Sequence, residues 1–207
     1  MIYSQILIQW MMSVMLALSP LDKQSDSREY ESSYEKELRL ESIAWDITSV
    51  VYDDNEKPLF PGADGREKSA VFVATWAAHE SGGFAKAIDE GRRKGDNGSS
   101  WCIMQLHIGA GKTAEGWTGS DVIRDRRKCI ASGYRVMKNA WGMCQGDPSE
   151  RMAAYISGRC DVSRDSSRTR YMHAMSLHRK YSLRKFAELS EQLDNQVTNV
   201  KFVQLSK

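Results

Sequence analysis

The stretch from Val71 to Phe84 constrains the fold more than any other part of the chain. It reads VFVATWAAHESGGF, so an almost entirely apolar segment ends in His-Glu-Ser followed by two glycines. Apolar residues on all sides are typical of a helix buried in a protein core. The glycines favour the left-handed backbone conformation that ends many helices. The pattern therefore predicts a helix over 68–81 that carries a carboxylate, Glu80, in its last turn.

The predicted position of Glu80 bears on its chemistry. Burial disfavours the charged form of a carboxyl group, and so does the negative end of a helix dipole. A carboxyl group that stays neutral near pH 7 can act as a general acid, as glycoside cleavage requires. The helix alone leaves an ordinary explanation open, in which the last turn frays into Gly82 and Gly83 and Glu80 is solvated.

Length and charge limit the classes of protein that this chain can belong to. A chain of 207 residues with 41% hydrophobic residues suits one compact domain with additional terminal segments. The 29 basic and 27 acidic residues give a net charge of only +2. A general nucleic-acid binder carries a larger excess of positive charge, so we expect no nucleic-acid partner.

The four cysteines are widely spaced, and no histidine stands at zinc-ligand spacing from them. This pattern predicts two disulfides, but four cysteines allow three pairings. We favour the pairs Cys102 with Cys129 and Cys144 with Cys160. Four free, buried thiols are the alternative.

Residues 1–18 form an apolar run without a charged residue. The run resembles the core of an export signal, although no Lys or Arg precedes it and Pro20 is unfavourable for cleavage after Ser19. A short membrane anchor and a buried amphipathic helix are the alternatives. We expect an export signal or a short anchor that attaches the protein to a membrane. The disulfides point to the same compartment, because they persist outside the cytosol.

The remaining chain suggests one mainly α-helical domain with a minimal β element. We expect residues 1–33 to be the signal or anchor with a Ser-rich linker, residues 34–181 to be the domain, and residues 182–207 to be a helical tail. A long surface loop is expected at 85–100, and the apolar run at 101–108 suits either a strand or a buried turn. Further helices are predicted over 34–53, 121–141, 148–155, 166–179 and 182–192.

Two familiar motifs are incomplete in this sequence. His79-Glu80 begins the zinc-protease motif HExxH, but residue 83 is Gly where the second histidine is needed. The segment GAGKT at 109–113 suggests a phosphate-binding loop, but residue 106 is Leu where that loop needs Gly. We therefore expect neither a zinc site nor a nucleotide site here.

Three segments in fixed order carry a stronger signal: HESGGF at 79–84, GDNGSSWCIMQLH at 95–107 and AAYISGRC at 153–160. Together they resemble the lysozyme-like superfamily, in particular lytic transglycosylases of the SLT type and goose-type or phage lysozymes. In those families a Glu-Ser pair ends a buried helix, a Ser/Gly-rich segment running into Met-Gln lines the sugar groove, and a Tyr-x-Ser/Ala-Gly segment closes the site. The resemblance covers about residues 68–178 and implies a lysozyme-like α+β fold.

The resemblance implies a role for each matching residue. Glu80 matches the catalytic acid, and Ser81 matches the residue after it, which is a structural or substrate hydrogen bonder. Tyr155 matches the tyrosine whose hydroxyl orients the acid or the sugar. The expected groove-lining residues are Ser100, Met104 and Gln105.

Two departures from the family pattern bear on a second carboxylate. Cys102 stands where the family usually has Gly, and His107 stands where goose-type lysozymes commonly carry Asp. Asp96, in a local Asp-x-Gly match, is then the best candidate for a second catalytic carboxylate. Asp-Asn-Gly is also a strong turn former, so a purely structural role stays open.

The implied substrate is the β-1,4 bond between N-acetylmuramic acid and N-acetylglucosamine in the glycan strands of peptidoglycan. With a second carboxylate the sugar is hydrolysed; without one, Glu80 takes a proton from the C6 hydroxyl and leaves a 1,6-anhydro sugar. We favour this transglycosylase route, which needs no metal or cofactor. The expected protein is a monomer that is exported to the bacterial periplasm or envelope, or a phage component acting there. A non-catalytic wall-binding assembly protein of the same fold and an unrelated helical secreted protein are the alternatives.

Overall fold

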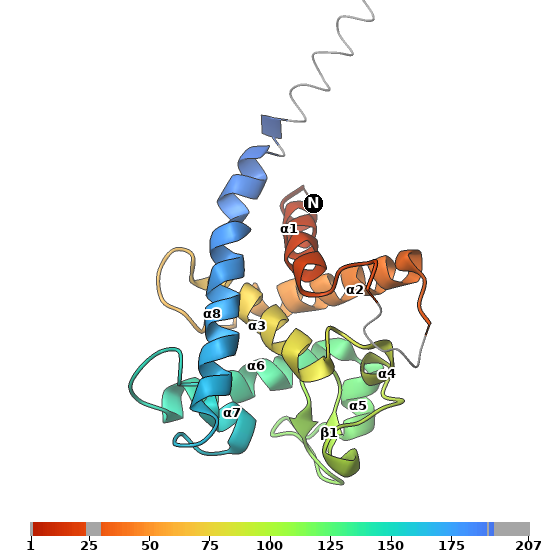
Figure 1. Ribbon diagram of the computed structural model, residues 1–207, viewed down its shortest axis with the longest axis vertical. Helices are drawn as coiled ribbons and strands as arrows, with labels where there is room; N and C mark the ends of the chain where they lie inside the picture. Colours follow the sequence, from red (N-terminus) through yellow and green to blue (C-terminus); the bar gives the residue numbers. More distant parts are fainter. Residues whose placement is uncertain (1, 24–29, 190, 193–207) are drawn as a thin grey trace, which may run out of the picture.

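Helix α3 (Gly65–Ser81) lies at the centre of the computed structural model, which describes residues 2–23, 30–189 and 191–192 (Figure 1). Every residue of α3 from Ser69 to Ala78 is buried. Helices α1 (Ile2–Leu18), α2 (Ser33–Val51) and α8 (Arg164–Lys180) pack against it. Gly82 ends it with a φ of 63°, in the left-handed region. The predicted buried helix is confirmed, and it begins three residues earlier than the pattern indicates.

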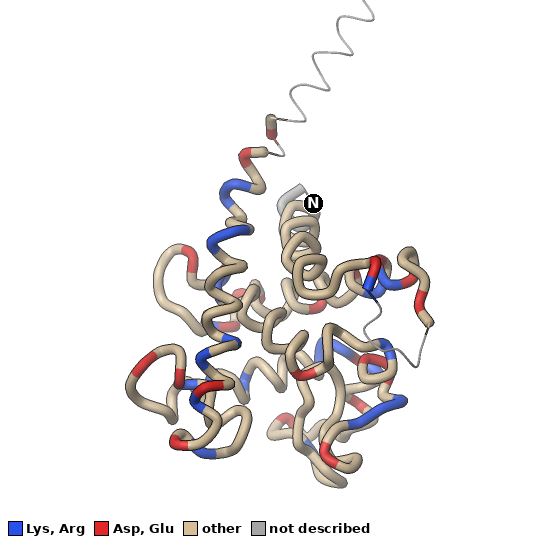
Figure 2. Tube along the Cα trace, in the orientation of Figure 1, with Lys and Arg blue, Asp and Glu red and all other residues tan. Residues whose placement is uncertain are grey.

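Helix α1 belongs to the core of this domain. It carries no charged side chain (Figure 2), and Trp10, Met11, Val14 and Met15 are fully buried. The indole Nε1 of Trp10 donates a hydrogen bond of 2.6 Å to the carbonyl of Tyr181. Helix α1 is therefore part of the domain, which we expect from the sequence to start at residue 34. The structure agrees with the alternative in which residues 1–18 form a buried helix. Among the helices that the structure describes, none has both the length and the apolarity to cross a membrane.

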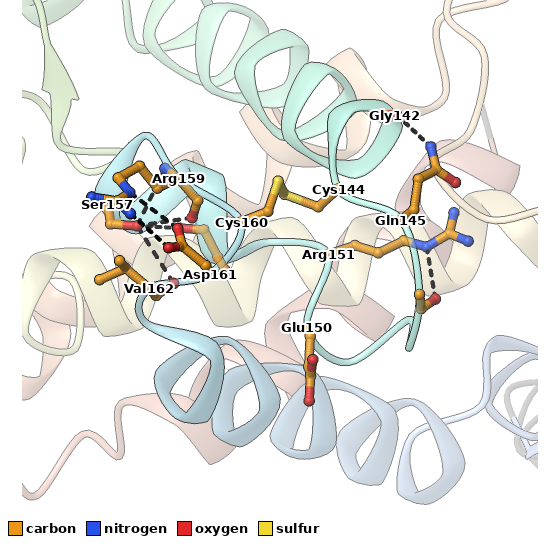
Figure 3. Close-up of a disulfide and its surroundings, with 12 residues drawn as sticks. Gly142, Cys144, Gln145, Glu150, Arg151, Ser157, Arg159, Cys160, Asp161 and Val162 are labelled. Atoms are coloured by element: carbon orange, nitrogen blue, oxygen red, sulfur yellow. Dashed lines mark hydrogen bonds and ion pairs between the residues drawn. A yellow bond between two sulfur atoms is a disulfide. The ribbon is translucent and has the colours of Figure 1, made fainter.

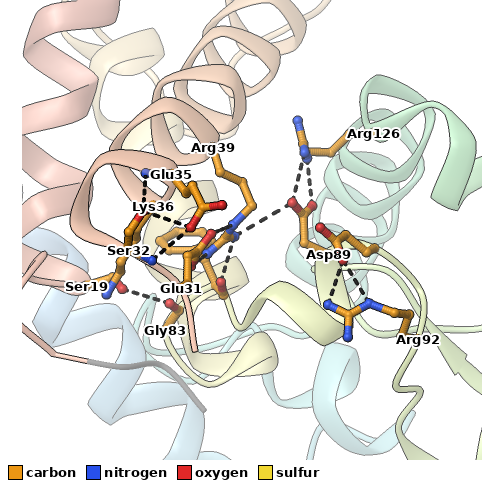
Figure 4. A network of polar contacts seen from close by, with 12 residues as sticks. Ser19, Glu31, Ser32, Glu35, Lys36, Arg39, Gly83, Asp89, Arg92 and Arg126 are labelled. Carbon is orange, nitrogen blue, oxygen red and sulfur yellow. Dashed lines mark hydrogen bonds and ion pairs between the residues drawn. The ribbon is translucent and has the colours of Figure 1, made fainter. Parts of the chain in front are cut away.

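A polar network fastens the segment after α1 to α2 and to the end of α3 (Figure 4). The buried amine of Lys36 donates to the carbonyls of Pro20, at 2.8 Å, and Lys23, at 2.5 Å. Ser19 Oγ donates to the Gly83 carbonyl at 2.8 Å, and Arg39 donates to the Phe84 carbonyl at the same distance. The backbone that follows Glu80 is thus held by two side chains from outside its own helix.

The segment after α3 contains short elements. Helix α4 (Lys86–Asp89) and the 3-10 turn η1 (Asp96–Gly98) lie within the loop expected at 85–100. Strands β1 (Ser100–Trp101) and β2 (Leu106–His107) form an antiparallel pair in which Ser100 faces His107. The run at 101–108, which suits a strand or a buried turn, is therefore both: two short strands joined by a buried turn.

The second half of the domain is helical, with two corrections to the predicted elements. The sequence predicts one helix over 121–141, but the structure has α5 (Gly119–Arg124) and α6 (Arg126–Met143). Asp125 separates them because its backbone is extended, with φ −130° and ψ 96°, and its side chain caps α6. Helix α7 (Ala153–Ser157) follows and ends at Gly158, as predicted. It begins at residue 153 and not at 148 as predicted, because residues 148–152 form turns. Residues 183–189 are also helical, whereas 193–207 of the expected tail lie outside the described residues.

Both predicted disulfides are present. Cys102, in the turn between the strands, is bonded to Cys129 of α6. Cys144, just after α6, is bonded to Cys160, just after α7 (Figure 3). The structure thus confirms a single, mainly helical domain with a small β element. The second disulfide ties the segment that contains α7 to the end of α6.

Candidate functional site

One cavity brings together residues from all three segments that the sequence singles out. Its volume is about 520 Å³. Glu80 comes from α3, the central segment supplies three residues, and α7 with Gly158 supplies the others. The lining residues are Glu80, Asp96, Gln105, His107, Ala154, Tyr155, Ile156, Ser157 and Gly158. Segments that lie far apart in the chain therefore share one concave site, as a common function requires.

Glu80 lies in the last turn of α3, and 17% of its side chain is exposed. Arg170 of α8 donates to its Oε1 and forms an ion pair with it. The guanidinium of Arg170 also lies over the indole ring of Trp76, with Cζ 4.8 Å from the ring centroid. The structure therefore places a positive charge directly beside the carboxyl group that the sequence singles out.

Tyr155 forms the wall of the cavity next to Glu80. Its hydroxyl donates a hydrogen bond of 2.6 Å to the carbonyl of Met104, and its ring meets that of Trp76 edge to face, with centroids 5.5 Å apart. Burial, followed by the charge of Glu80, raises the pKa of Tyr155 well above its usual value of about 10. Tyr155 therefore stays a neutral donor, which ties α7 to the turn between β1 and β2.

Three of the predicted substrate-binding residues lie in the core and support the site from behind. Ser81 is fully buried, where its Oγ donates to the Ala77 carbonyl at 2.6 Å and accepts from the Phe84 amide at 3.0 Å. Ser100 and Met104 are equally buried. Because these three side chains are buried, a substrate in the cavity would not contact them. They pack behind the residues that line the cavity.

Gln105 lies at the surface of the cavity. Its backbone is left-handed, with φ 47°, and its Nε2 donates to the Cys102 carbonyl at 2.9 Å. Its amide oxygen packs so closely on Gly95 that a Cβ there would lie 2.0 Å away. A side chain at residue 95 would therefore require the Gln105 amide to move.

Asp96 and His107 face the cavity from η1 and β2. The Ser100 hydroxyl donates to Asp96 Oδ2 at 2.5 Å, and the same oxygen lies 3.7 Å from His107 Nδ1. Both side chains are open to solvent, with exposed fractions of 70% for Asp96 and 74% for His107. The candidate second carboxylate is thus in the same cavity as Glu80, together with an imidazole that the sequence marked only as a departure from the family.

A second cavity, of about 310 Å³, continues from the first between β2 and α6. The two cavities share Gln105, His107 and Tyr155. An ion pair between Glu115 and Arg135 lies in its wall. The site is therefore longer than the space around Glu80, as binding of a chain-like ligand requires.

Arg170 and His107 are the functional candidates that motif reasoning missed. Arg170 is 90 residues from its partner Glu80, and its helix shows only general basic character in the sequence. Within the described part of the chain, no group of three or more His, Cys, Asp or Glu side chains could hold a metal ion.

Comparison with known proteins adds no assignment to this geometry, because no family model, no curated protein and no solved structure matches the chain.

Proposed function

We propose that this protein is a glycosidase that cleaves the β-1,4 bond between N-acetylmuramic acid and N-acetylglucosamine in peptidoglycan. The observation that carries the proposal is the shared cavity of Glu80, Asp96, Gln105 and Tyr155. Each of these residues comes from one of the three segments that resemble the lysozyme-like superfamily. A carboxyl group at the end of a buried helix, open to an elongated cavity, suits acid catalysis on a glycan strand.

In the proposed reaction, Glu80 in its protonated form gives its proton to the glycosidic oxygen as the bond to C1 breaks. The ion pair with Arg170 belongs to the resting enzyme, so substrate binding has to part the two side chains before Glu80 acts as an acid. The substrate's N-acetyl group supports the positive charge that develops at C1. The Glu80 carboxylate then takes the proton of the muramic C6 hydroxyl, whose oxygen bonds to C1 and closes the 1,6-anhydro ring.

Two other functions fit particular observations. A lysozyme-type hydrolase is favoured by the position of Asp96, which lines the same cavity and could place a water molecule. A wall-binding assembly protein without activity is favoured by the Glu80–Arg170 ion pair, because a binding protein needs no proton donor. In all three cases the protein works as a monomer at the bacterial envelope, exported or carried by a phage. The two disulfides agree with such a location.

Mass spectrometry of the soluble fragments released from purified peptidoglycan tests the proposal. The wild-type protein is expected to release fragments with 1,6-anhydromuramic ends. Glu80→Gln removes the acidic proton with little change in shape, so release should fall by a factor of about 100 or more. Glu37→Gln, the same chemical change at an exposed position of α2, is the matched control and should leave release unchanged.

The outcomes separate the three functions. Equal release by Glu80→Gln and wild type would show that Glu80 is not the acid. Release of fragments one water heavier than the anhydro products, without any anhydro ends, would identify a hydrolase. A folded wild-type protein that binds peptidoglycan but releases nothing would identify the wall-binding function.

A further inference from the structure

His107 lines the same cavity as Glu80. Its side chain projects from β2 and is 74% exposed, and it borders both the cavity with Glu80 and the second cavity. A histidine exchanges protons near neutral pH, which makes it the commonest general base in enzymes. An exposed imidazole in the same cavity as the candidate acid has direct access to water and to a bound glycan.

The position of Asp96 beside His107 is fixed by its surroundings. Its Oδ2 accepts a hydrogen bond of 2.5 Å from the buried hydroxyl of Ser100, and a bridge between Gly95 and Ser100 holds the backbone on either side. Asp96 and Asn97 both have left-handed φ values, 47° and 54°, which non-glycine residues seldom adopt. The tight turn thus presents the carboxylate to the imidazole.

The geometry of this pair indicates which nitrogen can act as a base. Asp96 Oδ2 lies 3.7 Å from Nδ1 of His107, so the carboxylate faces that nitrogen. The other nitrogen, Nε2, is on the far side of the ring and is the one left to accept a proton from a ligand. Asp96 itself already interacts with Ser100 and His107, so its part is to orient the imidazole.

From this arrangement we propose that His107, oriented by Asp96, is the general base that activates water for hydrolysis of the glycan. The inference rests on the proposed glycosidase function of Glu80. As the bond between C1 and the glycosidic oxygen breaks, that oxygen takes the proton of Glu80. A water molecule bonds to C1 through its oxygen and gives one proton to Nε2 of His107. Exchange with solvent then returns a proton to Glu80 and removes one from His107.

This reaction competes with closure of the anhydro ring, because both begin with the same protonation by Glu80. They differ in the group that attacks C1, which is water in one case and the C6 hydroxyl in the other. The wild-type protein is therefore expected to release two kinds of fragment, one with anhydro ends and one with reducing ends. The fraction of released fragments with reducing ends therefore measures the contribution of His107 to catalysis separately from that of Glu80.

The test is the product ratio for His107→Ala and Asp96→Asn on purified peptidoglycan, measured by mass spectrometry. His107→Ala should lower the share of reducing ends by at least about tenfold, while anhydro ends persist. This threshold is conservative, because general base catalysis typically contributes a factor of about 100 or more. Asp96→Asn should lower the share less, because it removes the orienting charge and keeps the base. Asp165→Asn, on the exposed side of α8, is the control and should not change the ratio.

Several results would overturn the inference. One is an unchanged ratio in His107→Ala, and another is a wild-type protein that gives anhydro ends alone. A third is loss of reducing ends in Asp96→Asn but not in His107→Ala, because Asp96 would then be the base. Should His107→Ala unfold, as judged by circular dichroism, His107→Gln replaces it. If the wild-type protein releases no fragments, both the proposed glycosidase function and this inference are overturned. If Glu80→Gln is inactive but His107→Ala leaves the product ratio unchanged, only this inference is refuted.

Discussion

Reduction of the two disulfides should cost this domain a large part of its stability. Cys102 and Cys129 are separated by 27 residues, and Cys144 and Cys160 by 16. A covalent link between two positions removes many conformations from the unfolded chain, so breaking it stabilises the unfolded state. The entropy involved grows only with the logarithm of the loop length, so the two bonds should have similar effects.

The loop lengths give the magnitude. The chain-entropy relation predicts about 3.5 kcal/mol for the 27-residue separation of Cys102 from Cys129 at 25 °C. The same relation predicts about 3.1 kcal/mol for the 16-residue separation of Cys144 from Cys160. A domain of this kind is stable by about 5 to 15 kcal/mol in total, so the loss of both bonds removes roughly half or more of its stability.

Urea unfolding followed by far-ultraviolet circular dichroism measures the effect. The oxidised protein is compared with the reduced protein, which keeps all four sulfur atoms and loses only the bonds. The paired variants Cys102→Ala with Cys129→Ala, and Cys144→Ala with Cys160→Ala, assign the loss to each bond. A loss below about 1 kcal/mol for either bond, or a difference above about 2 kcal/mol between the two paired variants, would refute the loop-entropy reasoning.

Three further predictions concern the surroundings of the site. Gly133→Ala should destabilise the domain by about 1 to 3 kcal/mol in urea, because its Cβ would lie 2.7 Å from side-chain atoms of Met104; an unchanged midpoint would contradict this packing. Tyr155→Phe should cost about 1 kcal/mol in the same assay, because the Met104 carbonyl loses its hydroxyl donor; a more stable variant would speak against the bond. Burial, then the charges of Arg170 and His173, lower the pKa of His79 from 6.5, so the folded state resists protonation there. The stability that neutral His79 contributes is complete above about pH 6.5 and is lost as the pH falls below that value. The free energy of unfolding in urea should therefore fall less for His79→Gln than for wild type between about pH 7 and about pH 5. Equal falls in the two proteins would disprove the assignment.

The sequence predicts those parts of the fold that depend on local pattern. Helix α3 is apolar on all sides and ends in glycine, so both its burial and its end at Gly82 could be predicted. The break at Asp125 could not, because the polar run around it has no proline or glycine and its cap depends on an extended backbone. Residues 1–18 were ambiguous for a different reason. An uncharged apolar segment has the same composition whether it is an export signal or a helix such as α1 that a domain buries.

The candidate site was predictable as far as its motifs reach. Glu80, Asp96, Gln105 and Tyr155 line one cavity, as their segments suggested. The sequence alone could not distinguish side chains that face the cavity from those packed behind it. The pairing of Arg170 with Glu80 depends on how α8 crosses α3, which no local pattern records.

The hydrogen bond between Trp10 and Tyr181 joins residues that are 171 positions apart in the chain. A ribosome adds about 5 to 20 residues per second, so roughly 9 to 34 seconds pass between the synthesis of Trp10 and that of Tyr181. Throughout that time an uncharged, apolar helix lacks part of its cover in the nascent chain. Helix α1 is therefore open to aggregation or to capture by a chaperone during synthesis, and closure of the domain over it has to follow the synthesis of Tyr181.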